Sequence, residues 1–337
     1  MERVLVVNVN WLGDCIMTLP AFSALKKEYP HVYTAVMAPG RVAEIFEKDP
    51  SIDEVLVFDE RTTHRSLPAK LRFIRALKEK RFDTAICIHR SCTRILICRL
   101  AGIPRRIGYH RRKTSWLINH KVKPPAGTGH RQDYYLCLFE AAAIPVKTRI
   151  PQVFIDDDVR HRMYYRLQRP EHTHAHLIGV QVSANWDQKR WPAQSYAELC
   201  DRLISRYSCA IFFVGTQKDA PAVSAVTEKM KRKDFYDFCG QTTLSELAAV
   251  MENFDLFISN DSGPAHLAAA VGIHTLVLFG PTDPEVTSPR GKYVHIVKSD
   301  VPCVIPCYKT DCKDNFCMSG ISVDEVIETV QYIFDNE

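Results

Sequence analysis

The sequence predicts an α/β protein with two Rossmann-like domains, each built on a parallel sheet. Short runs of β-branched and other apolar residues alternate with longer amphipathic segments, the pattern of repeated βα units. This alternation is interrupted once, around residues 145–175, and then starts again on a new strand. The length of 337 residues fits two domains of about 150 residues each better than one core.

The first half begins with an apolar strand, RVLVVNV, and three further runs of the same kind follow it. Amphipathic stretches of helical length separate these runs. The expected strands are 3–9, 32–37, 54–58 and 83–88, and the expected helices lie near 18–29, 40–48, 66–80 and 92–102.

The second half repeats the scheme after Pro145, Pro151, three consecutive aspartates at 156–158 and the polar segment 168–176. The expected strands are 176–182, 209–214, 255–259, 274–279 and 293–297, and the helices lie near 193–206, 219–232, 243–252 and 263–271. We therefore expect domains at 1–160 and 170–320, with a C-terminal helix within 321–337 that packs back on the first domain. A ligand is expected in the cleft at the carboxyl ends of the strands.

Composition and charge narrow the class of protein. Apolar residues make up 46% of the chain and charged residues 25%, as in globular proteins, and neither a signal peptide nor a transmembrane run is visible. Residues 1–150 hold 26 Lys and Arg against 14 Asp and Glu, whereas residues 151–337 hold 18 against 25. The excess lies between Arg61 and Lys113, which predicts an anionic partner unless these charges only solvate helix surfaces.

The stretch NWLGDCIMTLP, residues 10–20, places Gly13 and Asp14 directly after the first strand. A carboxylate at the carboxyl end of a strand faces the expected cleft, where it can take a proton from an attacking hydroxyl. Gly13 is expected to permit a tight turn there. The alternative is that Asp14 only caps the following helix.

Two polar turns of the second half suit a diphosphate. Asp261, Ser262 and Gly263 open a helix through His266, and the free N–H groups of such a helix start attract phosphate. Lys189 follows the strand 176–182 and could neutralise a departing diphosphate. The alternatives are helix caps that bind nothing and an ordinary surface lysine.

Together these stretches resemble glycosyltransferase family 9, which includes the ADP-heptose:lipopolysaccharide heptosyltransferases. The similar motifs are NWLGDCIMTLPAFSALKKEYP at the start, KRWP in the middle and SNDSGPAHLAAAVG with LFGPTDP late, and their order matches across almost the whole chain. RSCTRILICRLAGIPRRIGY, residues 90–109, is similar to the acceptor-side segment of the family. The segment CVIPCYKTDCKDNFCM is similar to that of the heptosyltransferase II type.

The resemblance implies a GT-B fold, with an acceptor domain at 1–160, a nucleotide-sugar domain at 170–320, and transfer by inversion without a metal or other cofactor. It implies that Asp14 is the base and that Lys189 binds the donor diphosphate and assists its departure. The residues implied to contact the donor are Gly13, Ser183, Lys189, Asp261, Ser262, Gly263 and His266. The arginines expected to hold the acceptor are Arg90, Arg94, Arg105 and Arg106.

The implied partners are an ADP-sugar donor and an anionic lipid-linked glycan acceptor, such as a Kdo-bearing or heptose-bearing lipid A. A cytoplasmic location follows, with peripheral contact at the inner membrane and without nucleic acid. Three alternatives stay open: another nucleotide sugar or acceptor, a sugar-nucleotide epimerase of the same shape, and a basic nucleic-acid-binding protein. Cys303, Cys307, Cys312 and Cys317 are free thiols, a zinc site or disulfides, and their spacing does not decide among these.

Overall fold

The computed structural model describes residues 1–125, 127, 129–167, 175–307, 309 and 311–336. The chain divides into two compact units, Met1–Phe154 and Ile155–Glu337, each with a parallel sheet of its own. The division lies within the interruption that the sequence predicts around 145–175, and most of the polar segment 168–176 falls outside the described residues. No helix in the described part of the chain is long and apolar enough to cross a membrane.

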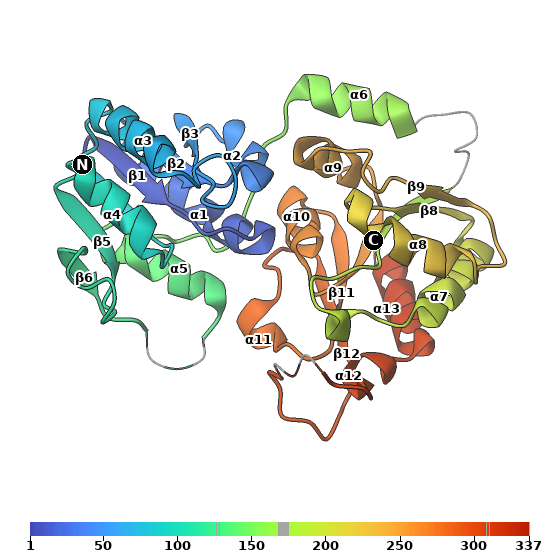
Figure 1. Cartoon of the computed structure of the whole chain (residues 1–337). Coiled ribbons are helices and arrows are strands. Elements are labelled where there is room, and N and C mark those ends of the chain that lie inside the picture. Colours follow the sequence, from blue (N-terminus) through green and yellow to red (C-terminus); the bar gives the residue numbers. More distant parts are fainter. Residues whose placement is uncertain (126, 128, 168–174, 308, 310, 337) are drawn as a thin grey trace. The chain divides into compact units, whose positions relative to one another are not determined.

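The first unit contains a six-stranded parallel sheet in the order β3-β2-β1-β4-β5-β6 (Figure 1). Its strands are β1 Arg3–Val7, β2 Tyr33–Ala38, β3 Glu54–Val57, β4 Thr84–Cys87, β5 Arg105–Tyr109 and β6 His120–Val122. The centre is buried because Val4, Leu5, Val6 and Val7 are fully enclosed, as expected for a strand covered on both faces. The strands β5 and β6 are additions to the four that the sequence predicts.

Helices pack on this sheet in pairs, α3 beside α4 and α1 beside α5 (Figure 1). Their bounds are α1 Leu12–Glu28, α2 Glu44–Glu47, α3 Leu67–Glu79, α4 Cys92–Leu100 and α5 Arg131–Glu140, with a 3₁₀ turn at Gly40–Val42. The side chains of Ser66 and Ser91 cap α3 and α4 by accepting backbone N–H groups. The sequence analysis missed α5, which sits just before the predicted boundary.

The second unit repeats the topology in the order β12-β11-β10-β7-β8-β9. Its strands are β7 His176–Gln181, β8 Cys209–Phe213, β9 Phe235–Asp237, β10 Leu256–Asn260, β11 His274–Phe279 and β12 Val294–Lys298. All pairs in both sheets are parallel, as the alternation of strands and helices predicts. The three-residue edge strand β9 is the one that the sequence analysis missed here.

The helices of the second unit are α6 Asp157–Leu167, α7 Ala193–Tyr207, α8 Ala220–Thr227, α9 Leu244–Met251, α10 Gly263–Val271, α11 Pro284–Thr287, α12 Phe316–Ser319 and α13 Val323–Asp335, with 3₁₀ turns at Asp187–Lys189 and Gln217–Asp219. Of these, α7, α9, α10 and α13 agree closely with the predicted ranges, α8 ends before its predicted range does, and α6, α11 and α12 were not predicted. The helix α6, which contains two of the acidic residues taken as an interruption, packs on α9 (Figure 1).

The C-terminal helix α13 corrects one expectation. It packs on α7 and β12, and Val326, Ile327, Val330 and Ile333 lie in the core of the second unit. The expectation was that this helix packs back on the first domain. An amphipathic helix buries its apolar face on the nearest core that is incomplete without it, and here that core belongs to the second unit.

Both sheets have a topological switch point, where the strand order changes direction. It lies between β1 and β4 in the first unit and between β10 and β7 in the second. In open α/β sheets, ligands bind at the carboxyl ends of the strands at this point. The segments that follow these four strands therefore define the candidate site of each unit.

Candidate active site

Asp14 lies in the first turn of α1, immediately beyond the carboxyl end of β1. The helix starts at Leu12, and its N-cap residue Trp11 makes no side-chain capping hydrogen bond. Asp14 is therefore not the N-cap residue of this helix. Gly13 is helical and is not among the glycines with positive φ, so the expected tight turn at Gly13 is wrong.

Two side chains of α5 contact the Asp14 carboxylate. The Tyr135 hydroxyl donates a hydrogen bond to Asp14 Oδ1 at 2.9 Å, and Arg131 Nη1 lies 3.8 Å from the same oxygen. The Asp14 side chain keeps 15% of its surface exposed, so it remains accessible to a ligand. Sequence reasoning missed both partners because the aromatic run YYLCLF within α5 shows no clear polar face that would mark it as a helix.

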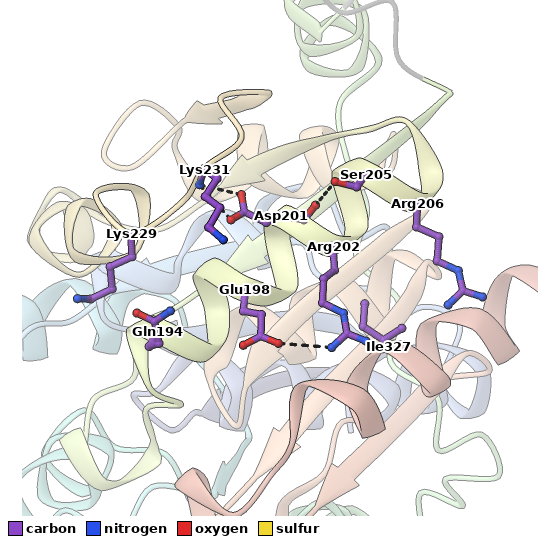
Figure 2. A pocket seen from close by; sticks show the side chains of 9 residues that line it. All are labelled: Gln194, Glu198, Asp201, Arg202, Ser205, Arg206, Lys229, Lys231 and Ile327. Atoms are coloured by element: carbon purple, nitrogen blue, oxygen red, sulfur yellow. Dashed lines mark hydrogen bonds and ion pairs between the residues drawn. The ribbon is translucent and has the colours of Figure 1, made fainter.

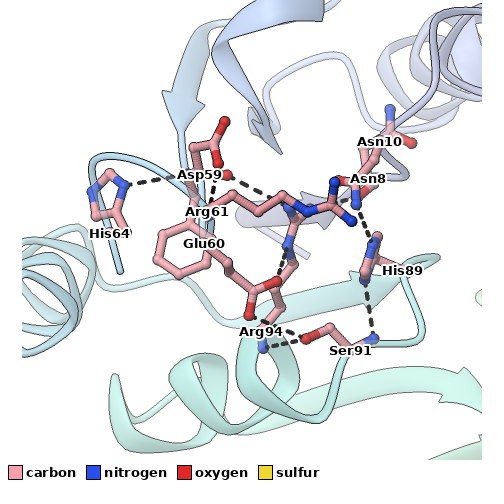
Figure 3. A network of polar contacts seen from close by, with 10 residues as sticks. Asn8, Asn10, Asp59, Glu60, Arg61, His64, His89, Ser91 and Arg94 are labelled. Atoms are coloured by element: carbon pink, nitrogen blue, oxygen red, sulfur yellow. Dashed lines mark hydrogen bonds and ion pairs between the residues drawn. The ribbon is translucent and has the colours of Figure 1, made fainter. Parts of the chain in front are cut away.

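Arg94 is the centre of a polar network at the carboxyl ends of β1, β3 and β4 (Figure 3). Its guanidinium donates to the backbone oxygens of Asn8 at 3.1 Å and Phe58 at 3.5 Å, and its Nε lies 3.5 Å from Glu60 Oε2. Only 2% of the Arg94 side chain is exposed. The expectation that Arg94 holds the acceptor is therefore wrong, because its guanidinium is buried and already bonded to the segments that follow β1 and β3.

His89 belongs to the same network (Figure 3). The Ser91 N–H donates to His89 Nδ1 at 3.0 Å, and the Asn10 side-chain amide contacts Nε2 at 2.8 Å. Burial lowers the pKa of His89 to about 4, and the nearby charges of Arg94 and Arg90 act in the same direction. The ring is therefore neutral at physiological pH, and it orders the segment that carries Arg90.

Exposed arginines surround this edge of the sheet. Arg90 lies over the Tyr134 ring at 5.1 Å, and Arg41 donates to the Asn10 backbone oxygen at 2.8 Å. Arg131 is the third, with 42% of its side chain exposed. The acceptor role of Arg90 stays a prediction, and the structure places two arginines that the sequence analysis did not select, Arg41 and Arg131, at the same edge.

Arg105 and Arg106 lie at the opposite edge. They begin β5, and Arg105 aligns with Thr84, the first residue of β4, so the two sit about 10–13 Å along the strand from its carboxyl end. Arg106 also donates to the backbone oxygens of Ile103 and Leu117. The structure therefore does not bring these two arginines, which were expected to hold the acceptor, to the end of the sheet where Asp14 lies, because they begin a strand.

In the second unit, Lys189 forms a close ion pair with Asp261. Lys189 Nζ lies 2.5 Å from Asp261 Oδ2, and the Thr282 hydroxyl donates to the same oxygen at 2.7 Å. The Asp261 side chain is 6% exposed, whereas that of Lys189 is 19% exposed. Asp261 therefore orients the lysine, and only the lysine of this pair carries a charge suited to a diphosphate. Thr282, from the GPTDP turn, is a further member that the sequence analysis missed.

The start of α10 supplies backbone N–H groups near the carboxyl end of β10. Gly263 begins the helix, and the N-cap residue Ser262 makes no side-chain capping bond. The Ser262 hydroxyl instead contacts Ser259 Oγ at 2.9 Å and Gln181 Oε1 at 3.2 Å. His266 lies in the first turn of α10 and is buried. The helix start therefore offers its backbone, rather than the Ser262 side chain, to an anion.

Asn260 ties these loops together. Its Oδ1 accepts from the Trp191 backbone N–H at 3.1 Å and from the Tyr196 hydroxyl at 3.0 Å. Its Nδ2 donates to the backbone oxygens of Val182 at 3.0 Å and Ser183 at 3.3 Å. Ser183 is buried beside the carboxyl end of β7. The segments that carry Lys189 and Asp261 are thereby fixed to each other.

The four late cysteines are free thiols in the structure. The Cys307 N–H donates to the backbone oxygen of Pro281 at 2.7 Å, and Ser299 Oγ donates to that of Cys317 at 2.9 Å. No group of three or more His, Cys, Asp or Glu residues within the described ranges is placed to hold a metal ion. The cysteine segment thus packs against the turn that carries Thr282.

A surface hollow of about 600 Å³ lies on the outer side of α7 (Figure 2). Two of its charged side chains already have partners within the protein. Arg202 pairs with Glu198 and Asp324, and the Asp201 carboxylate accepts hydrogen bonds from the backbone N–H groups of Lys231 and Arg232. We assign no substrate to this hollow, because it lies outside the loops at the switch point.

Comparison with known proteins places this geometry in a family. The family model "Glycosyltransferase family 9 (heptosyltransferase)" matches residues 70–316. Lipooligosaccharide heptosyltransferase 2 of Haemophilus influenzae is 26% identical over 95% of both chains. Lipopolysaccharide heptosyltransferase 2 of Escherichia coli is 24% identical over 88% of both chains.

Solved structures share the fold. A family 9 glycosyltransferase from Veillonella parvula has a TM-score of 0.87 and 24% identity, covering 100% of this chain and 98% of its own. The E. coli ADP-heptose lps heptosyltransferase II has a TM-score of 0.82 and 22% identity, covering 99% and 98%. An E. coli heptosyltransferase solved with ADP has a TM-score of 0.76 and 19% identity, covering 98% and 100%.

These matches confirm the GT-B class of fold, with its two α/β units. The family match spans most of the chain and reaches both units, so it supports the glycosyltransferase interpretation over the alternative of a nucleic-acid-binding protein. The chain belongs to glycosyltransferase family 9, the heptosyltransferases of lipopolysaccharide biosynthesis.

Proposed function

We propose that this heptosyltransferase moves heptose from ADP-heptose to the inner core of lipopolysaccharide, on a Kdo- or heptose-bearing lipid A acceptor. The observation that carries the proposal is that the switch points of the two units differ in chemistry. The first has an accessible carboxylate, Asp14, among exposed arginines, and the second has Lys189 beside an uncapped helix start. The structures of similar enzymes with ADP support the choice of nucleotide.

The proposed reaction is a single displacement with inversion. Asp14 accepts the proton of the acceptor hydroxyl while its oxygen bonds to the anomeric carbon of the heptose. The bond from that carbon to the diphosphate oxygen breaks, and ADP departs with the bonding electrons. Lys189 and the N–H groups at the start of α10 stabilise the growing negative charge. These groups supply the positive charge that the step requires, so we propose that it proceeds without a metal.

The first unit is proposed to bind the acceptor. The exposed residues Arg41 and Arg90 come from two different segments near Asp14, and their charge suits an anionic sugar or a phosphate. The strongly basic balance of the first half extends this attraction over a wider surface. An anionic lipid acceptor presented at the inner membrane satisfies both observations.

A crossed pair of substitutions tests the proposal. Asp14→Asn keeps the shape of the side chain but removes the base, and we expect kcat for heptose transfer to fall about 10²–10⁴-fold with ADP affinity unchanged. Lys189→Met removes the cation, and we expect ADP affinity to fall about tenfold or more. Transfer is followed by the mass of the glycolipid product, and ADP binding by calorimetry.

The neighbouring substitution Arg190→Met is the matched control for Lys189→Met, since Arg190 bonds to Ala184 and Asp187 within its own loop. Near-normal transfer by a folded Asp14→Asn enzyme would remove Asp14 from the reaction. Equal loss of ADP affinity in both lysine and arginine variants would mean that loop order, rather than the Lys189 charge, holds the diphosphate.

A further inference from the structure

The carboxylate of Asp14 is held from one side by a single helix. Tyr135 and Arg131 are four residues apart on α5, so they project from the same face of the helix. Both contact Oδ1 of Asp14, the tyrosine by a hydrogen bond of 2.9 Å and the arginine at 3.8 Å. The two side chains therefore act on one oxygen atom of one carboxylate.

The position of α5 is itself fixed. It packs on α1, the helix that carries Asp14, and the rings of Phe22 and Phe139 lie 6.4 Å apart across this contact. Gln132 is fully buried, and its side-chain amide donates to the backbone oxygen of Arg149 at 2.8 Å. A buried, hydrogen-bonded helix start of this kind places Tyr135 with little freedom to move.

Tyr135 is suited to donate and not to accept. Only 6% of the residue is exposed. Burial and the negative charge of Asp14 raise the pKa of Tyr135 well above its ordinary value, so the hydroxyl keeps its proton across the working range of the enzyme. A donor aimed at a carboxylate stabilises the ionised form, which is the form that a general base requires.

Further charged and titratable groups near this carboxylate lie on other segments. Arg90 follows β4 and acts on Tyr135, Arg41 lies in the 3₁₀ turn after β2 and, like Arg94 on α4, acts on Cys15, and the Cys15 thiol is next to Asp14 on α1. Burial raises the pKa of Cys15, so this thiol stays neutral. The arginines named here are positive, and their charge favours an ionised carboxylate.

We propose that Tyr135 and Arg131 are positioning residues for transfer, which fix the Asp14 carboxylate and keep it ionised. This inference rests on the proposed role of Asp14 as the base. It goes beyond that role because it assigns the control of the base to α5, a helix outside the three motifs that resemble the family.

Tyr135→Phe removes one hydroxyl and retains the ring. We expect the acidic limb of the pH profile of kcat to move upward by about one pH unit, because loss of a donor to the charged form raises the pKa of the carboxyl group. The KM for ADP-heptose should stay unchanged. The matched control is Tyr134→Phe, since the buried Tyr134 hydroxyl has no hydrogen-bond partner among the described residues. This control should leave the limb where it is.

The role of Arg131 is tested by substitutions that remove or keep its positive charge. Arg131→Met should move the same limb upward, and Arg131→Lys, which keeps the charge, should restore part of the shift. An increase in KM for the acceptor without a shift of the limb would instead show that Arg131 binds substrate and does not control the base. That result would overturn its assignment as a positioning residue.

A direct titration separates this inference from the proposed function. The ¹³Cγ signal of Asp14, identified by its loss in Asp14→Asn, should titrate at higher pH in Tyr135→Phe than in the unaltered protein and in Tyr134→Phe. An unchanged titration with inactive Asp14→Asn would refute the positioning role and leave the base in place. Normal transfer by Asp14→Asn would overturn both.

Discussion

The protonation of His89 is set by its place in the fold. In an unfolded chain a histidine has a pKa near 6.5, whereas burial and two arginines lower that of His89 to about 4. Between these two values the unfolded chain binds a proton that the folded protein does not. Stability therefore rises with pH across this window and is lost as the pH falls from about 6.5 towards 4.

We expect the free energy of unfolding to fall by about 2 kcal/mol on this account between pH 7 and pH 5. His89→Gln should remove this part of the pH dependence, as measured by urea unfolding at the two pH values. The exposed residue His31, changed to Gln, is the control. An equal pH dependence in His89→Gln and the unaltered protein would contradict the assignment.

Single residues also show where sequence reasoning stops. Asp14 and Lys189 lie in the segments that follow apolar strands, so their placement near the carboxyl ends of those strands follows from order along the chain alone. Arg94, Arg105 and Arg106 were chosen by charge, and charge does not reveal burial or which edge of a sheet a residue occupies. Tyr135 and Thr282 act across 121 and 21 residues of chain, distances at which local patterns carry no signal.

At the scale of elements, the start of α10 differs from the helix starts that are capped. Ser66, Ser91, Thr243 and Ser322 cap their own helices with side-chain hydrogen bonds, whereas α10, like α1, α7 and α8, lacks such a cap. The helix α10 follows β10, which borders the switch point of the second unit. A helix without a side-chain cap leaves its first N–H groups to another acceptor, and in the second unit the proposed acceptor is the diphosphate.

The helix α13 belongs to the second unit, and this can be tested. Ile333→Ala removes a side chain that is 1% exposed, and we expect a loss of about 2–4 kcal/mol in the stability of that unit. Hydrogen exchange should accelerate in peptides of α7 and β12 and stay unchanged in peptides of residues 1–154. The exposed Glu328, changed to Ala, is the control, and faster exchange confined to the first unit would contradict this packing.

The elements that the sequence did not predict have a common character. The strands β6 and β9 have three residues each and lie at sheet edges, where few apolar side chains are buried and the alternating pattern is short. The strand β5 has the sequence RRIGY, and α5 is dense in aromatic residues. By contrast, the central strands and α7, α10 and α13 were predicted well, because long apolar runs and clear amphipathic faces identify them.

At the scale of the whole molecule, both units have the same sheet topology but an opposite balance of charge. Each unit has the strand order of a Rossmann-like sheet, and each concentrates its polar side chains at the switch point. The first half is basic and the second acidic, so we expect an anionic acceptor to be attracted to the first. The repeated topology and this difference in charge were predictable from sequence, because they depend on composition and on the order of strands.

Nucleotide choice is a property of the folded second unit and can be measured without an acceptor. We expect ADP at about one hundred times its Kd to raise Tm by about 5–10 °C, because a ligand that binds only the folded state stabilises it by about 2.7 kcal/mol. UDP and GDP should have smaller effects, and Lys189→Met should diminish the response to ADP. Equal stabilisation by all three nucleotides would contradict a preference for adenine.

The pairing of Lys189 with Asp261 has a consequence for turnover. When no nucleotide is present, Lys189 already forms an ion pair with Asp261. The free enzyme therefore does not hold a partly buried, unpaired ammonium group. In the proposed cycle, the ammonium group of Lys189 pairs again with the Asp261 carboxylate when the diphosphate leaves. The hydrogen bond from Thr282 keeps that carboxylate in position. The Lys189–Asp261 pair therefore lowers the free-energy cost of releasing ADP, in addition to its proposed part in stabilising the transition state. The site can then bind the next donor molecule.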